Sequence, residues 1–147
     1  MKKLIINLPV PKYKIIYIVG NYEDVAIWIK GKIETADNKQ LRNLLEERLE
    51  NFIMNEEVDS KGHRKIDGGK TVGLTIKLVK GQADLIWINT RSCKTKRKQL
   101  STVVHENRHI ADHIEKYRGI HDSEFFAYLE GYLYEQIEEL VNKKEEG

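Results

Sequence analysis

Residues 72–119 read VGLTIKLVKGQADLIWINTRSCKTKRKQLSTVVHENRHIADHIEKYRG and contain two kinds of pattern. Val72–Val79 and Ala83–Asn89 are short runs rich in β-branched and other apolar residues, and they predict two strands joined by a tight turn. From Thr95 to Tyr117, apolar residues recur every three or four positions, which predicts an amphipathic helix that ends at Gly119. Strands followed by a long helix favour an α+β fold.

More strands are expected towards the N-terminus. Tyr13–Val19 and Val25–Ile33 are rich in Ile, Val, Tyr and Trp, and Gly20-Asn21 between them is typical of a turn. These residues predict a hairpin, to which Leu4–Leu8 could add a third strand. Residues 1–34 are therefore interpreted as N-terminal strands.

Helices are expected in two further segments. Leu, Phe and Ile recur at helical spacing over residues 36–54, and Asp37 is the expected N-cap. A last helix is expected over residues 122–142. Residues 1–147 are thus interpreted as a single domain, in which the 36–54 helix backs a small mixed sheet and residues 71–118 supply strands and a long helix.

The composition is that of an ordinary globular chain. It is 40% hydrophobic and 33% charged, with a net charge of +2, so no global charge demands a nucleic-acid partner. A basic run over residues 91–98 is interpreted first as a solvated loop and only second as a contact for a phosphate backbone. Cys93 is the only cysteine, and no run approaches the ~20 apolar residues of a membrane helix. A cytoplasmic location without membrane contact is therefore expected.

The motif that carries chemistry is His105-Glu106-Asn107-Arg108-His109, which has the form H-E-x-x-H within a predicted helix. Residues four apart lie one turn apart on the same face, so both imidazoles can reach one metal ion. Glu106 lies about 100° further round the helix and can touch a metal-bound water without being a ligand. Zinc lowers the pKa of such a water, and a neighbouring carboxylate can take its proton. The motif therefore predicts a zinc site with Glu106 as general base.

A helical wheel separates the motif from the apolar side of its helix. The side expected to face the core consists of Leu100, Val103, Val104, Ile110, Ala111 and Ile114. The opposite side, expected to lie outside the core, consists of His105, His109, Asp112 and His113. The two ligand histidines are therefore not expected to be core residues satisfied by packing.

Two segments resemble a known family. Residues 103–110, VVHENRHI, resemble the active-site helix of zincin metallopeptidases. Residues 122–132, DSEFFAYLEGY, are similar to the glutamate helix of small gluzincin-like proteins, including predicted peptidases common in phage genomes. The resemblance covers roughly residues 72–133. It implies a minimal zincin-like domain of α+β class, located in a host cytoplasm or a virion if the chain is phage-encoded.

The resemblance also implies a third zinc ligand and a place for the substrate. In that family a carboxylate from the following helix completes the site, and the matching position here is Glu124. His113 and His121 remain alternative ligands. The strand before the active helix, Ala83–Asn89, is implied to be the edge strand along which a peptide or protein substrate lies.

Other residues have candidate supporting roles. Asp112 could hydrogen-bond a ligand imidazole and fix its tautomer, or could be an exposed charge. A peptidase also needs a group that stabilises the oxyanion, for which Tyr128 and Tyr132 are candidates. Arg108 departs from the family pattern, because zincin peptidases usually have uncharged residues between the two histidines.

These features favour zinc-dependent hydrolysis of peptide bonds through a zinc-bound water, with Glu106 as general base and Tyr128 as a second catalytic residue. The alternative is a non-catalytic module of the zincin fold, such as a phage virion or assembly protein, that keeps the metal site. Such a module has no need for Glu106, because this residue is not a ligand in the zincin interpretation. Its presence therefore favours catalysis.

Overall fold

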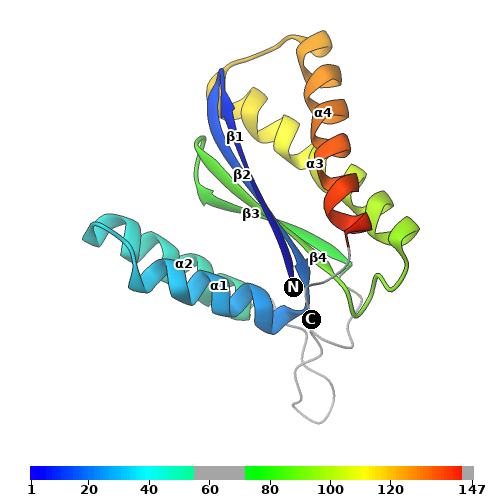
Figure 1. Ribbon diagram of the computed structural model, residues 1–147. Coiled ribbons are helices and arrows are strands. Elements are labelled where there is room, and N and C mark those ends of the chain that lie inside the picture. Colours follow the sequence, from blue (N-terminus) through cyan, green and yellow to red (C-terminus); the bar gives the residue numbers. More distant parts are fainter. Residues whose placement is uncertain (55–71, 144–147) are drawn as a thin grey trace.

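The computed structural model describes residues 1–54 and 72–143, and their side chains outside 51–54. These residues form an α+β fold, in which a four-stranded mixed sheet lies between two pairs of helices (Figure 1). Within them the elements are, in chain order, β1 (Lys2–Pro9), β2 (Lys12–Gly20), α1 (Tyr22–Glu34), α2 (Lys39–Met54), β3 (Gly73–Val79), β4 (Ala83–Asn89), α3 (Lys96–Arg118) and α4 (Ser123–Asn142).

The sheet has the strand order β1-β2-β4-β3. Strands β1 and β2 are antiparallel, as are β3 and β4, and the two hairpins are joined by parallel pairing of β2 with β4. The prediction that Ala83–Asn89 is an edge strand is therefore wrong. This strand is central because β2 pairs with it across a long sequence separation, and β3 lies at the edge of the described sheet instead.

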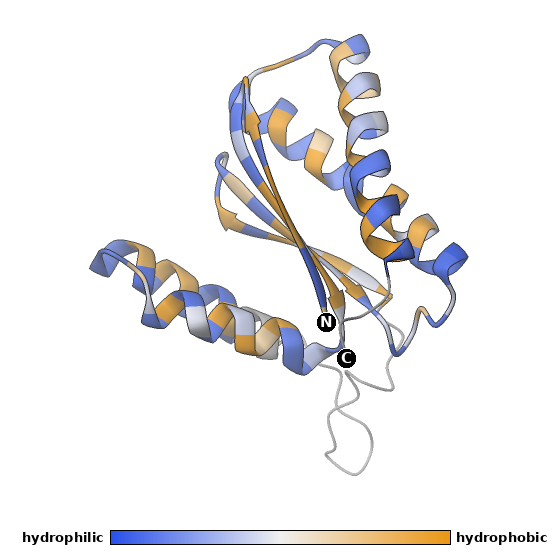
Figure 2. Ribbon diagram, viewed as in Figure 1, coloured by the Kyte–Doolittle hydropathy of each residue, from blue (hydrophilic) through white to orange (hydrophobic). Residues whose placement is uncertain are grey.

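A separate hydrophobic core lies on each face of the sheet. On β2 and β4 the side chains alternate, so that Tyr17 and Ile86 pack towards α3 and α4, while Ile18 and Trp87 pack towards α1 and α2. Figure 2 shows apolar residues along these strands and on the helix sides that face them. Burial on both faces explains why every residue of β4 is buried.

The prediction of a strand over Val25–Ile33 is wrong, because this segment is helix α1. Asn21 accepts a hydrogen bond from the Asp24 amide at 3.0 Å, and the Asp24 carboxylate accepts one from the Asn21 amide at 2.9 Å. This reciprocal capping box starts a helix directly after β2. A Cβ at Gly20 would lie 2.3 Å from Asp24 Oδ2, so a larger residue here would displace the carboxylate that completes the capping box. The expected hairpin turn is therefore a strand-to-helix junction.

The other helices follow the sequence-based expectation closely. Helix α3 is capped by Thr95 and ends at Gly119, which has a left-handed φ of 67°. Asp122 caps α4 through the amides of Glu124 and Phe125. Helix α2 starts slightly later than expected, because Asn38 rather than Asp37 accepts a bond from the Leu41 amide. In the described part of the chain, no helix combines the length and apolar character needed to cross a bilayer.

Candidate metal centre

Helix α3 is packed on two sides, and this determines which of its residues reach solvent. It contacts β3 and β4 on one side and α4 on another. Its buried residues are Thr102, Val103, Glu106, Asn107, Ile110, Ala111 and Ile114. His105 and His109 are exposed, as predicted, and their ring centroids lie 5.2 Å apart.

His105, Glu106 and His109 form a group that could hold a metal ion. Each offers one ligand atom, and these atoms all lie within 4.8 Å of one another. Imidazole nitrogens and a carboxylate oxygen are donors that zinc and related divalent transition metals accept, so the residues present fit such an ion. The local geometry of an α-helix is sufficient to bring the two imidazoles together, because residues four apart are neighbours on its surface.

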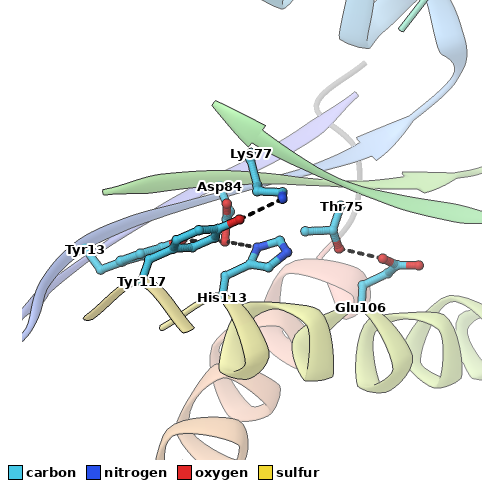
Figure 3. A network of polar contacts seen from close by, with 7 residues as sticks. All are labelled: Tyr13, Thr75, Lys77, Asp84, Glu106, His113 and Tyr117. Atoms are coloured by element: carbon cyan, nitrogen blue, oxygen red, sulfur yellow. Dashed lines mark hydrogen bonds and ion pairs between the residues drawn. The ribbon is translucent and has the colours of Figure 1, made fainter. Parts of the chain in front are cut away.

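Glu106 is held from the sheet side. Its side chain is 5% exposed, and Thr75 of β3 donates a hydrogen bond to Glu106 Oε2 at 2.5 Å (Figure 3). Strand β3 passes close to the helix here, since a Cβ at Gly73 would lie 2.5 Å from Thr102 Cγ2. Thr75 was not among the residues predicted for the site. Nothing local marks this threonine, because its role depends on the packing of β3 against α3.

His113 faces the sheet, which corrects the expectation that it lies opposite the core. Its Nδ1 lies 2.9 Å from Asp84 Oδ2, and its side chain is only 16% exposed. Asp84 is fully buried in β4 and also accepts a hydrogen bond from the Tyr13 hydroxyl at 2.7 Å. Burial and the adjacent Asp84 carboxylate raise the pKa of Tyr13. One ring nitrogen of His113 is thus engaged by Asp84, a partner that sequence analysis missed.

The physical reason is the seven-residue spacing of Glu106 and His113. Seven residues are nearly two turns, so both side chains lie on the same face of α3 and point towards β3 and β4 (Figure 3). The only feature of the sequence that indicated a polar partner for His113 was the charged Asp84 inside an otherwise apolar strand. Val104 was expected to face the core, but it is 56% exposed. The buried side of α3 faces the sheet and therefore includes Glu106 and not Val104.

A second buried hydrogen bond anchors the same helix. The Tyr17 hydroxyl donates to Asn107 Oδ1 at 2.6 Å, and both residues are buried. Burial raises the pKa of Tyr17, so the hydroxyl stays protonated and able to donate. The backbone of α3 around His105 and His109 is therefore fixed by polar contacts as well as by apolar packing.

The remaining predicted site residues lie outside the metal group. Glu124 is exposed in the first turn of α4, and Tyr128 is 75% exposed on the same helix. Asp112 is exposed and lines a groove between α3 and α4, and His121 Nδ1 lies 3.8 Å from Glu115 Oε1. No observation tests their roles, which stay predictions.

Arg108, the departure from the zincin pattern, has a partner on α4. Its Nη1 lies 3.7 Å from Glu130 Oε1, although the Arg108 side chain remains largely exposed. The guanidinium is thus directed towards α4, whereas Glu106 is directed towards β3. Arg108 therefore does not compete with Thr75 for the Glu106 carboxylate.

Comparisons with protein-family models, with curated proteins and with solved structures gave no match. What is established is a His-Glu-His group on α3 within an α+β fold.

Proposed function

We propose that the protein is a zinc-dependent peptidase in which His105 and His109 bind zinc and Glu106 is the general base. The observation that carries the proposal is the group of ligand atoms from these three residues, all within 4.8 Å of one another. Two exposed imidazoles beside a buried, hydrogen-bonded carboxylate offer a metal site open to substrate together with a base in a fixed position.

The chain's own residues supply proton transfer. When bound, zinc supplies a Lewis acid that polarises a carbonyl group and acidifies water. Thr75 engages Glu106 Oε2 and so orients the carboxylate. Glu106 then accepts a proton from the attacking water and donates it to the leaving amine, which restores the carboxylate for the next turnover.

The proposal keeps Glu124 as third protein ligand and Tyr128 as the group that stabilises the oxyanion. Both are exposed on α4, which packs alongside α3. Within the described residues, the side chains of Glu124 and Tyr128 form no hydrogen bond and no ion pair. They are therefore free to turn towards a ligand.

Replacing Glu124 by alanine is expected to weaken zinc binding by more than about 100-fold, because loss of a direct ligand costs more than loss of an outer partner. Titration with a competing chromophoric chelator measures the dissociation constant. Glu135→Ala is the matched control, since Glu135 is also exposed on α4. Equal zinc affinities for the two variants would remove Glu124 from the ligand set.

One observation favours a second candidate, a non-catalytic module that holds a metal. Glu106 is almost completely buried and already bonded to Thr75, as a structural acceptor or a third metal ligand would be. In that case the His-Glu-His group stabilises the fold around α3, and no base faces a substrate.

A protease assay separates the two candidates. Fluorescein-labelled denatured casein is incubated with the zinc-loaded protein, with the protein in excess chelator, and with the protein after zinc is restored. The peptidase hydrolyses casein only in the first and third samples. A protein that binds zinc tightly but releases no labelled peptide in any sample is the non-catalytic module.

A further inference from the structure

A cluster of lysines surrounds Tyr117 near the end of α3. Lys77 donates a hydrogen bond to the Tyr117 hydroxyl at 3.0 Å (Figure 3). The ammonium nitrogens of Lys77, Lys80 and Lys116 lie 5.3, 5.0 and 5.3 Å from the centroid of the Tyr117 ring. The hydrogen bond from Lys77 and the charges of these lysines lower the pKa of Tyr117. Three positive charges therefore converge on one side chain.

The cluster borders a cavity of about 1140 Å³. Lys80 and Tyr117 line this cavity together with Lys12 and Lys14 of β2. Arg118 also lines it, but its Nη1 donates to the carbonyls of Lys12 and Gly81, at 2.8 and 3.2 Å, and so ties two walls together. We call this cavity, with Lys12, Lys14, Lys77, Lys80 and Lys116, the basic pocket.

In the described part of the chain, the lysines of the basic pocket have no direct carboxylate partner, although Asp84, which is engaged by Tyr13 and His113, lies opposite Lys77 in the pairing of β3 with β4. Within residues 1–54 and 72–143, none of its five lysines forms an ion pair with a carboxylate. The chain as a whole has a net charge of only +2, so the positive potential is local. Ammonium groups gathered around one ring repel one another, and an anionic ligand would relieve this repulsion.

Strand β3 links the basic pocket to the candidate metal centre, because its residues contact both. Thr75, which holds Glu106, and Lys77, which bonds Tyr117, both point towards α3 (Figure 3). They are two residues apart, or about 7 Å along a strand. Lys80 follows at the turn into β4 and lines the cavity. An extended ligand along β3 therefore passes from Glu106 into the basic pocket within a few residues.

The form of β3 favours a peptide as that ligand. Among the described strands, β3 pairs only with β4 and has a free edge. Edge strands pair with extended peptides through their backbone groups. A single nucleic-acid strand gains much of its affinity from bases that stack on open aromatic faces, whereas three lysines lie close to the ring of Tyr117.

We propose that the basic pocket binds acidic side chains of a peptide that lies along β3. The substrate class of the proposed peptidase is then acidic peptides, with a carboxylate two to five residues from the bond beside Glu106. The proposal that such peptides are hydrolysed depends on the proposed function. The proposal that they bind depends only on β3 and the basic pocket.

Fluorescence anisotropy tests the binding in excess chelator, which prevents turnover. The probes are a fluorescein-labelled 12-residue peptide with Glu at alternate positions, the same peptide with Gln in place of Glu, and a 12-nucleotide oligothymidylate. The test variant is Lys80→Gln/Lys116→Gln, and the matched control is Lys96→Gln/Lys98→Gln in the basic run before the metal centre. All four lysines are exposed, so both variants are expected to fold.

The Glu peptide is expected to bind about tenfold more tightly than the Gln peptide at low ionic strength. The Lys80→Gln/Lys116→Gln variant should lose about five- to tenfold in affinity for the Glu peptide, and the control less than twofold. Equal binding of the two peptides would overturn the proposal. The proposal would also be overturned if the oligothymidylate bound more tightly than the Glu peptide and the test variant lost this binding. That result would identify a nucleic-acid site.

Failure of the proposed function gives a different result. If the Glu peptide binds at Lys80 and Lys116 but the zinc-loaded protein does not cleave it, the peptide site stands and the peptidase does not. If the protein cleaves casein but does not distinguish Glu from Gln peptides in binding, the peptidase stands and the acidic specificity is wrong.

Discussion

Replacing Glu106 by glutamine is expected to lower kcat for casein hydrolysis by about 10²–10⁴-fold while leaving the zinc content unchanged. Glutamine keeps the size of the side chain, and its amide oxygen can still accept the hydrogen bond from Thr75. It cannot accept a proton from water at neutral pH. Initial rates and metal analysis on the same samples measure both quantities.

Glu115→Gln is the matched control for this substitution, because Glu115 is exposed on the same helix. Its rate and zinc content should equal those of the wild type. Full activity of the Glu106→Gln variant would exclude Glu106 as the base. Loss of zinc from that variant would instead identify Glu106 as a ligand, as its place in the His-Glu-His group also permits.

Replacing Asp84 by alanine is expected to lower the free energy of unfolding by about 2–4 kcal/mol, since it leaves two donors without an acceptor. Asp84 Oδ2 accepts from the buried Tyr13 hydroxyl and contacts His113 Nδ1. The expected loss of stability is smaller than the cost of two fully buried donors without acceptors, because the His113 side chain retains some access to water. The midpoint and slope of urea unfolding give the change.

Asp112→Ala is the control, because Asp112 is exposed on α3, and it should change stability by less than about 0.5 kcal/mol. Asp84→Asn should fall between the two variants, since an amide keeps one acceptor oxygen. If Asp84→Ala were as stable as Asp112→Ala, the buried contacts between β4 and α3 would contribute nothing to stability.

Features fixed by neighbouring residues could be predicted from the sequence. Thr95 and Gly119 bound α3, and Asp122 starts α4, through contacts within a few residues. The pairing of His105 with His109 is equally local, because it follows from one turn of helix. The α+β class could be predicted for the same reason, as it depends on element types rather than on their pairing.

Features that depend on distant contacts could not be predicted. Residues 25–33 have the composition of a strand, and Trp28 packs against the sheet as part of a helix; the capping box at Asn21 and Asp24 was a local signal for this helix that the strand-like composition outweighed. The central position of β4 comes from its pairing with β2. Composition and periodicity contain no information about such partners.

The same limit applies to the surroundings of the metal group. The helical wheel separated the apolar side of α3 from the polar one, but it could not show that the sheet covers part of the polar side. His113 and Glu106 therefore face β4 and β3, where Asp84 and Thr75 are their partners. Those contacts join residues that lie about thirty positions apart in the sequence.

Zinc content of the purified protein tests the central claim most directly. After dialysis against zinc and then against metal-free buffer, elemental analysis should find close to one zinc per chain in the wild type. The His105→Ala/His109→Ala variant should retain close to none, because it lacks both imidazole ligands. His121→Ala, which removes an exposed histidine outside the group, should retain the wild-type content. Equal zinc content in the double variant and the wild type would contradict the assignment of the metal centre to α3.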